Sequence, residues 1–239
     1  MLALSGLIIA FAFFIQFLMG FGGGLVAVPL LGIYMPMADA VNLVMLFQLM
    51  TGIAIISIYK DVDWQTIKVL IPSSLIGIVI GVFGLKYING DAIRIFLALF
   101  IILYLAKAHM GKDYIGQSVK KCGTHGAGLA GGFIAGLVGM GAPIYVVFFN
   151  ENNVSGKTLR ANMLVILFLT YLARLPLSAG AGLITPQLFK DFVLIIPAFL
   201  LAAFLGQKIN TKINEHLFAK IMGVLLLASA ISLLAKALI

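Results

Sequence analysis

The residue best suited to bind a ligand is an arginine inside an apolar stretch. Arg174 lies within the apolar run 169–177, about one turn before a polar loop. Its fixed charge and forked donors suit the oxygens of a sulfonate or carboxylate. Two placements are open for the guanidinium, which either snorkels to a membrane interface or faces an internal cavity and pairs with an anion.

Glycine interrupts two other apolar runs, at 20–24 and at 139–143. The first interruption would leave free N–H groups at the start of a half-helix that passes through Pro29, and Pro143 stands where a second half-helix would begin. Paired helix N-termini offer partial positive charge and unpaired donors to an anion. The alternative is that the glycines only permit tight hairpins and close packing.

Two asparagines, Asn42 and Asn162, occupy equivalent places near the start of a helix in each half of the chain. They either line a shared cavity or serve as interhelical hydrogen bonds or helix caps. Gln48, two turns deeper than Asn42, is a further candidate. The predicted substrate-binding residues are Gly20, Gly22, Gly23, Gly24, Pro29, Asn42, Gln48, Gly139, Gly141, Ala142, Pro143, Asn162 and Arg174.

Acidic residues fall only in loops or at the ends of apolar segments. Because cation and proton pathways commonly use a carboxylate within the membrane, this placement disfavours a cation carrier. The three histidines show no metal-ligand spacing, and neither a Ser/His/Asp arrangement nor a phosphate-binding GxxxxGK occurs. The lone Cys122 cannot form an intrachain disulfide. We therefore predict no enzyme activity, no cofactor and no metal site.

Composition identifies the class of protein. Hydrophobic residues make up 62% of the 239 residues and charged residues 10%, too few charges to cover a soluble surface of this size. The net charge of +8 comes from basic residues in short loops, where it orients the chain in a bilayer. This excludes a nucleic-acid binder, a secreted disulfide scaffold and a disordered chain, and leaves membrane lipid and a small anion as the expected partners.

Polar loops separate eight apolar segments, most of them close to the roughly 20 residues that cross a bilayer. The first segment is too long for one crossing, so it must break or double back at its glycines. It contains no charge before Asp39, which favours mature membrane structure over a cleavable signal. The segments are 2–36, 40–59, 67–86, 92–108, 125–149, 158–176, 192–208 and 217–238.

An internal repeat relates the two halves. Matched pairs occur in the same order in both halves, with one small insertion in the loop 178–187. The chain is therefore predicted to be two homologous repeats, 1–108 and 125–239, joined by a polar linker, 109–124. The pairs are Gly20-Phe21-Gly22 with Gly139-Met140-Gly141, Asn42 with Asn162, Pro72 with Pro197, Gly81 with Gly206, and Ile88-Asn89 with Ile213-Asn214.

The distribution of basic residues favours an inverted relation between the repeats. If both glycine-broken segments enter and leave on one side, most basic residues gather on one face, as the positive-inside rule requires. Each half then crosses three times, an odd number, so the halves are inverted. We predict an all-α polytopic membrane protein of two inverted repeats, each a re-entrant glycine-rich hairpin plus three transmembrane helices. A single crossing by each broken segment stays open.

Glycines also recur at intervals of four on two segments, and this spacing is typical of helix packing rather than of ligand binding. We expect close contact between helices there. The residues are Gly77 and Gly81 on one segment and Gly128, Gly132 and Gly136 on the other.

The two glycine-rich runs resemble the repeated signatures of the TauE/SafE sulfite exporter family. The first reads Gly-Phe-Gly-Gly-Gly-Leu-Val-Ala-Val-Pro over 20–29 and the second Gly-Leu-Val-Gly-Met-Gly-Ala-Pro over 136–143. The resemblance implies transport of sulfite or organosulfonates such as sulfoacetate across the bacterial inner membrane. Ala142 replaces the more usual second glycine, which would narrow the backbone cradle and alter substrate preference.

The leading function is therefore a secondary transporter that exports small sulfur-containing anions by alternating access. An anion channel or uniporter, or a carrier of another small carboxylate-type anion with the same fold, is the alternative. Which anion is carried, the coupling to protons or voltage, and a homo-oligomeric state all stay open at this level.

Overall fold

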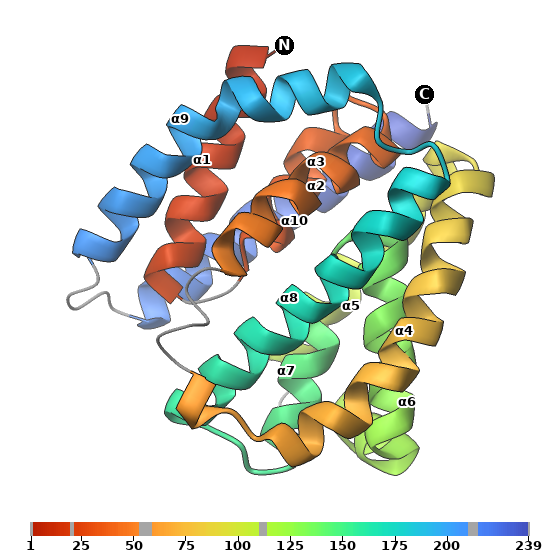
Figure 1. Ribbon diagram of the computed structural model, residues 1–239, viewed down its shortest axis with the longest axis vertical. Helices are drawn as coiled ribbons and strands as arrows, with labels where there is room; N and C mark the ends of the chain where they lie inside the picture. The colour runs from red at the N-terminus through yellow and green to blue at the C-terminus, as the bar shows by residue number, and fades with distance from the viewer. Residues whose placement is uncertain (1, 20–21, 53–58, 110–113, 210–214, 239) are drawn as a thin grey trace.

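The computed structural model describes residues 2–19, 22–52, 59–109, 114–209 and 215–238, and every regular element in these ranges is helical (Figure 1). The predicted all-α class is confirmed for this part of the chain. The helices of the first half are α1 (Leu2–Met19), α2 (Gly23–Gly32), α3 (Met37–Met50), η2 (Tyr59–Asp61, a 3-10 turn), α4 (Trp64–Tyr87) and α5 (Gly90–His109). Those of the second half are α6 (Tyr114–Val138), α7 (Ala142–Glu151), α8 (Gly156–Gly180), α9 (Pro186–Ile209) and α10 (Glu215–Leu238).

The first apolar segment breaks at its glycines, as predicted. α1 ends at Met19, and α2 starts after Gly22, whose φ of 108° is a left-handed conformation that a residue with a Cβ rarely adopts. The 10 residues of α2 extend about 15 Å, half the thickness of a hydrocarbon core. α2 is therefore a half-helix.

The fifth apolar segment breaks in the same way. Gly139 has a φ of 71° between the end of α6 and the start of α7, and α7 is again a half-helix of 10 residues. Pro143 lies in the first turn of α7, where its missing N–H leaves no intrahelical bond unmade. Each half of the chain thus begins with one broken segment and continues with three further helices.

Two boundaries differ from the sequence-based expectation. α6 begins at Tyr114, before the expected start of the fifth apolar segment at 125, and Gly123 interrupts its helical conformation with a φ of 65°. α8 continues past Pro176 to Gly180, although the apolar segment was expected to end at this proline. A proline within a membrane helix is tolerated where neighbouring groups satisfy the freed carbonyl. Arg174 consequently lies well inside a helix rather than near its end.

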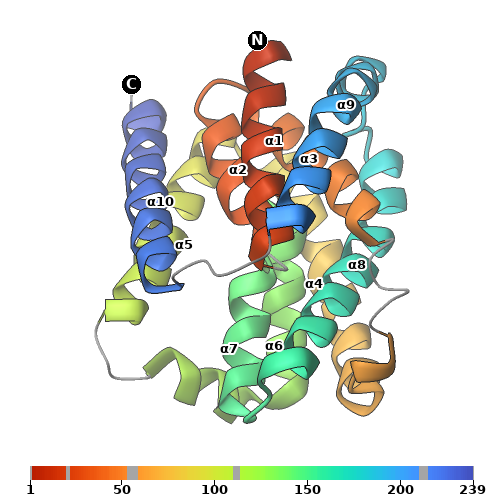
Figure 2. The ribbon, with the colours of Figure 1, turned by 90° about the vertical axis from the view of Figure 1, so that its left-hand side faces the viewer.

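Helices of one half pack mainly on helices of the other. α1 packs on α9 and α6 packs on α4, while α5 contacts α10 and α3 contacts α8. In Figure 2, α1 and α2 lie in the upper part of the molecule and α6 and α7 in the lower part. The two broken segments therefore approach each other from opposite ends, and the core lies between the halves.

α4 and α6 contact each other through backbone rather than side chains. A Cβ added to Gly136 would lie 2.6 Å from the Ile78 carbonyl oxygen, and one added to Gly81 would lie 2.6 Å from the Leu137 amide nitrogen. Gly77, Gly128 and Gly132 face equally close neighbours on the opposite helix. The predicted glycine packing between these segments is confirmed, and it brings the two helices as close as their backbones allow.

The contact between α1 and α9 is built from aromatic rings. Phe13 on α1 lies edge-on to Phe199 on α9, with ring centroids 5.0 Å apart, and Phe47 on α3 lies 5.2 Å from the same ring. Offset and tilted ring pairs of this kind contribute about 0.5–1.5 kcal/mol beyond their buried area. The contact combines these rings with a close backbone approach, since a Cβ added to Gly206 on α9 would lie 3.0 Å from the Phe14 carbonyl oxygen on α1.

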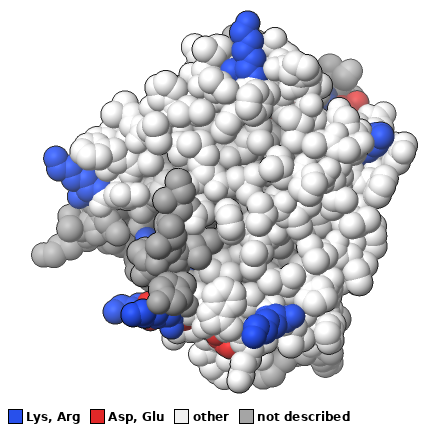
Figure 3. Space-filling view, viewed as in Figure 1, with Lys and Arg blue, Asp and Glu red and all other residues white. Residues whose placement is uncertain are grey.

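The outer surface is that of a membrane protein. Large apolar side chains such as Ile76, Leu201 and Phe204 are exposed, and Figure 3 shows a broad uncharged face with lysine and arginine side chains at its margins. Among the described residues three helices are long and apolar enough to cross a bilayer, namely α4, α8 and α9. The inverted relation of the halves stays a prediction.

Arg94 clamps the end of the half-helix α2. From α5, its Nε donates to the Gly32 carbonyl at 3.1 Å and its Nη2 to the Met35 carbonyl at 3.2 Å, while Nη1 pairs with Asp91. A cation at a helix C-terminus also complements the helix dipole. Arg94 therefore holds α2 and the loop after it against α5.

Asp63 caps the start of α4. Its Oδ1 accepts the backbone N–H groups of Gln65 and Thr66 at 3.2 Å each, and its Oδ2 accepts the Thr66 hydroxyl at 2.6 Å. The hydroxyl of Thr66, followed by these backbone donors, holds the pKa of the Asp63 carboxyl below its ordinary value. The cap is therefore made by the charged carboxylate.

We expect Gly132→Ala to destabilise the protein by about 1–3 kcal/mol, because the new methyl group would meet the backbone of Ser74 on α4. Gly180→Ala is the control, since nothing lies within 4 Å of the Cβ it would add. Thermal unfolding in detergent measures both. Equal melting temperatures for the two variants would contradict the backbone contact between α4 and α6.

Asp63→Ala should lower the free energy of unfolding by about 1 kcal/mol at neutral pH through loss of the cap. Because the native pKa of Asp63 is lowered, the stabilisation is present above the ordinary carboxyl pKa and is lost as the pH falls through the lowered value. Melting temperatures over an acidic pH series should therefore converge for the wild type and Asp63→Ala. Asn also caps a helix but does not titrate, so the melting temperatures of Asp63→Asn and Asp63→Ala should not converge as the pH falls.

Candidate functional site

The two helix breaks meet in the interior. A Cβ added to Gly24 on α2 would lie 3.3 Å from the Gly139 carbonyl oxygen and 3.4 Å from Gln48 Nε2 on α3. A Cβ here would make a tighter contact than most side chains make, so glycine favours this close approach of α2 to the second break. The structure thus brings together Gly24, Gln48 and Gly139, three of the predicted substrate-binding residues.

α8 supplies two polar side chains to the same place. The Tyr171 hydroxyl donates to the Gly139 carbonyl oxygen at 3.0 Å. Arg174 Nη1 lies 3.5 Å from the position that a Cβ of Gly139 would take. Residues three apart share one face of a helix, so Tyr171 and Arg174 reach the break together.

Arg174 is fully buried and its guanidinium has no hydrogen-bond partner among the described residues. With a relative exposure of 0%, the side chain lies inside the helix bundle and does not snorkel to the surface. A buried, unpaired charge is strongly unfavourable, and a hydrogen-bonded counter-charge relieves that cost. Nε, Nη1 and Nη2 are therefore all available to oxygens of an anion.

A hydroxyl one turn along α8 is unpaired as well. Ser178 is four residues after Arg174, so the two share a helix face, and its buried Oγ has no hydrogen-bond partner among the described residues. α8 thus presents a charged donor and a neutral one in series along its buried face.

At the first break, side-chain amides form hydrogen bonds with the backbone and with each other. Gln16 Oε1 accepts the Gly23 N–H at 2.9 Å, and the side chains of Gln16 and Gln48 exchange two further bonds of 2.9 Å. Gln16 Nε2 also donates to Thr51 Oγ1 at 3.3 Å. The expectation of free N–H groups at the start of α2 is therefore wrong for Gly23, because Gln16 of α1, seven residues earlier, accepts its N–H.

The two asparagines make different contacts. Both are fully buried. Asn42 Nδ2 donates to the Ala38 carbonyl at 2.7 Å, and its Oδ1 has no partner within the described residues. Asn162 Oδ1 accepts the Asp63 N–H at 2.8 Å, and its Nδ2 has none there. Asn162 thus helps to orient the start of α4, and a role of either residue in binding stays a prediction.

The remaining predicted residues shape the backbone of the two hairpins. A Cβ on Gly141 would lie 2.7 Å from the Gly131 carbonyl oxygen and 2.9 Å from the Ala135 Cβ, so Gly141 packs against α6. Gly22 turns the chain before α2, Pro29 is buried inside α2, and Ala142 and Pro143 begin α7. Gly20 lies outside the described residues.

Sequence reasoning did not assign Tyr171, Gln16 or Ser178 to the site. Tyr171 and Ser178 stand three residues before and four residues after Arg174, and this helical spacing is a signal that could have found them. Gln16 lacks such a signal, because its partner Gly23 lies across a change of chain direction that the sequence does not specify in detail.

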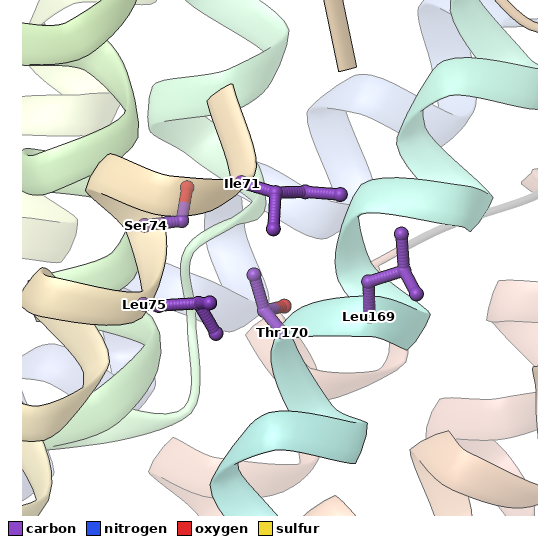
Figure 4. Close-up of a pocket in the computed structure, with 5 residues that line it drawn as sticks. All are labelled: Ile71, Ser74, Leu75, Leu169 and Thr170. Carbon is purple, nitrogen blue, oxygen red and sulfur yellow. The ribbon is translucent and has the colours of Figure 1, made fainter. Parts of the chain in front are cut away.

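A small cavity of about 10 Å³ lies between α4 and α8, lined by Ile71, Ser74, Leu75, Leu169 and Thr170 (Figure 4). Its volume suffices for about one water molecule. The Ser74 and Thr170 hydroxyls donate to the carbonyls of Leu70 and Leu167 on their own helices. This cavity is too small and too apolar to hold an oxyanion.

Comparison with known proteins identifies the family. No curated protein and no solved structure matches the chain. A family model described as Sulfite exporter TauE/SafE matches residues 5–233, which include both helix breaks and Arg174. The match extends over nearly the whole chain, and the protein therefore belongs to the TauE/SafE sulfite exporter family of membrane transporters.

Proposed function

We propose that the protein exports a small sulfur-containing anion, sulfite or an organosulfonate such as sulfoacetate, across the bacterial inner membrane. Family membership supports an anion exporter. The observation that carries the proposal is Arg174, a fully buried guanidinium without a partner among the described residues, at the point where the two helix breaks meet.

The chemistry of the site fits a sulfur oxyanion. A guanidinium presents donors in a planar fork that matches two oxygens of a sulfite or sulfonate group at once. Tyr171 bonds Gly139 and so holds α8 against the second break, while Gln16 and Gln48 hold the first. These contacts hold the helices around Arg174 without neutralising its positive charge. The bound anion then supplies the negative countercharge.

The proposed mechanism is alternating access between two inverted repeats. The exchange of packing partners supports it, because α1 rests on α9 of the other half and α6 rests on α4 of the other half. In our proposal the pair α4–α6 moves as one body, since its backbones are in contact, and rocks against the pair α1–α9. The substrate site between the break tips then opens to each side in turn.

Arg174→Met should weaken binding of sulfite and sulfoacetate at least about tenfold, because charged hydrogen bonds contribute about 1.5–3 kcal/mol. In the absence of anion the same variant should melt at the same or a higher temperature, since it removes an unpaired buried charge. The dependence of export from proteoliposomes on anion concentration measures the weaker binding, and thermal unfolding measures the melting temperature. Acetate is tested alongside sulfite and sulfoacetate.

Arg94→Met is the matched control, because Arg94 is bonded to Gly32 and Met35 and lies outside the site. It should lower the melting temperature and leave anion affinity unchanged. The proposal would be overturned if Arg174→Met exported sulfite like the wild type, or if it unfolded the protein and so proved structural.

The mode of transport is tested by applying a pH gradient and a membrane voltage separately to the same proteoliposomes. Transport by a carrier whose site opens to one side at a time should saturate with anion concentration and exchange internal for external sulfite. Ohmic current without saturation would instead identify an anion channel built on the same fold.

A further inference from the structure

The described residues give the site a single positive charge. Among the residues whose burial is described, Arg174 is the one fully buried basic side chain. Arg94 is partly exposed and paired with Asp91, and each remaining lysine or arginine of that set is exposed. A ligand at Arg174 therefore meets one full countercharge.

The described groups beside the guanidinium at the second break are neutral. Tyr171 bonds the Gly139 carbonyl oxygen there, and the position of a Gly139 Cβ lies 3.5 Å from Arg174 Nη1, 3.2 Å from Val41 and 3.7 Å from Val28. None of the other titratable side chains described on elements packed against α8 is hydrogen-bonded to Arg174. They are Asp39 on α3, Lys60 and Asp61 on η2, Lys68, Lys86 and Tyr87 on α4, His125 on α6, and Glu151 and the Ser74-bonded Tyr145, which lies near Tyr171, on α7.

We infer that the site accepts its anion in the singly charged form and discriminates against doubly charged anions. This inference rests on the proposed function and specifies its substrate as hydrogensulfite or a simple organosulfonate. One negative charge beside Arg174 makes a neutral buried pair. A second would be left uncompensated in a medium of low polarity, where an unpaired charge is strongly disfavoured.

The inference has a consequence for proton movement. Sulfite exists near neutral pH as an interconverting pair, the dianion and its protonated monoanion. Export of the monoanion carries one proton out with each sulfite, and the proton is bound to the substrate rather than to the protein. No carboxylate is then needed within the membrane, in agreement with the position of the described acidic residues at helix ends and in loops.

Isothermal titration of the purified full-length protein tests this with three anions of defined charge. Methanesulfonate is a monoanion throughout, sulfate is a dianion, and sulfite changes charge at the second pKa of sulfurous acid. We expect sulfate to bind at least about tenfold more weakly than methanesulfonate. Sulfite affinity should fall about tenfold per pH unit above that pKa, while methanesulfonate affinity stays constant over the same range.

Two variants separate charge from shape. Arg174→Lys keeps one positive charge, so it should bind methanesulfonate more weakly and still prefer it to sulfate. Arg174→Gln should lose affinity for both. Sulfate binding as tight as methanesulfonate binding, or sulfite affinity that rises with pH, would overturn the inference while leaving anion export intact. If the wild type bound no anion of either charge, the proposed function itself would fail and the inference with it.

Discussion

Backbone amides and carbonyls inside a membrane must find partners within the protein, and this constraint governs the centre of the molecule. Both helix breaks expose such groups. Gln16 accepts the Gly23 N–H at the first break, and Tyr171 donates to the Gly139 carbonyl at the second. Each partner comes from another helix, so a break can exist only if the surrounding helices are already in place.

The need for a partner at the Gly139 carbonyl also determines where the charge of Arg174 lies. α8 must lie against the second break for Tyr171 to reach Gly139, and the same helix face then carries Arg174 into the interior. The polar partners at the first break are amides that satisfy one another, so they add no charge there. Among the described residues the interior then holds one cation without a partner, Arg174, and this cation is the physical basis of the anion site that we propose.

Much of the architecture follows from one-dimensional rules. A segment longer than a bilayer is thick must break, and glycine with a neighbouring proline marks the place, as at Gly22 and Pro143. Glycines four apart predict close helix contact, which α4 and α6 make through Gly77, Gly132 and Gly136. α8 extends beyond the predicted apolar segment 158–176, because a membrane helix can accommodate Pro176.

By itself the sequence determined the helical membrane class of the protein, the two breaks and the candidate arginine, because these depend on composition and on spacing along one helix. Tertiary structure alone decided that the breaks touch at Gly24 and Gly139, that Gln16 caps Gly23, and that Arg174 is buried rather than at the interface. These contacts join helices distant in the chain, and their geometry depends on how the halves pack. The chemical character of a side chain can be read from the sequence, whereas the groups that it contacts depend on the tertiary fold.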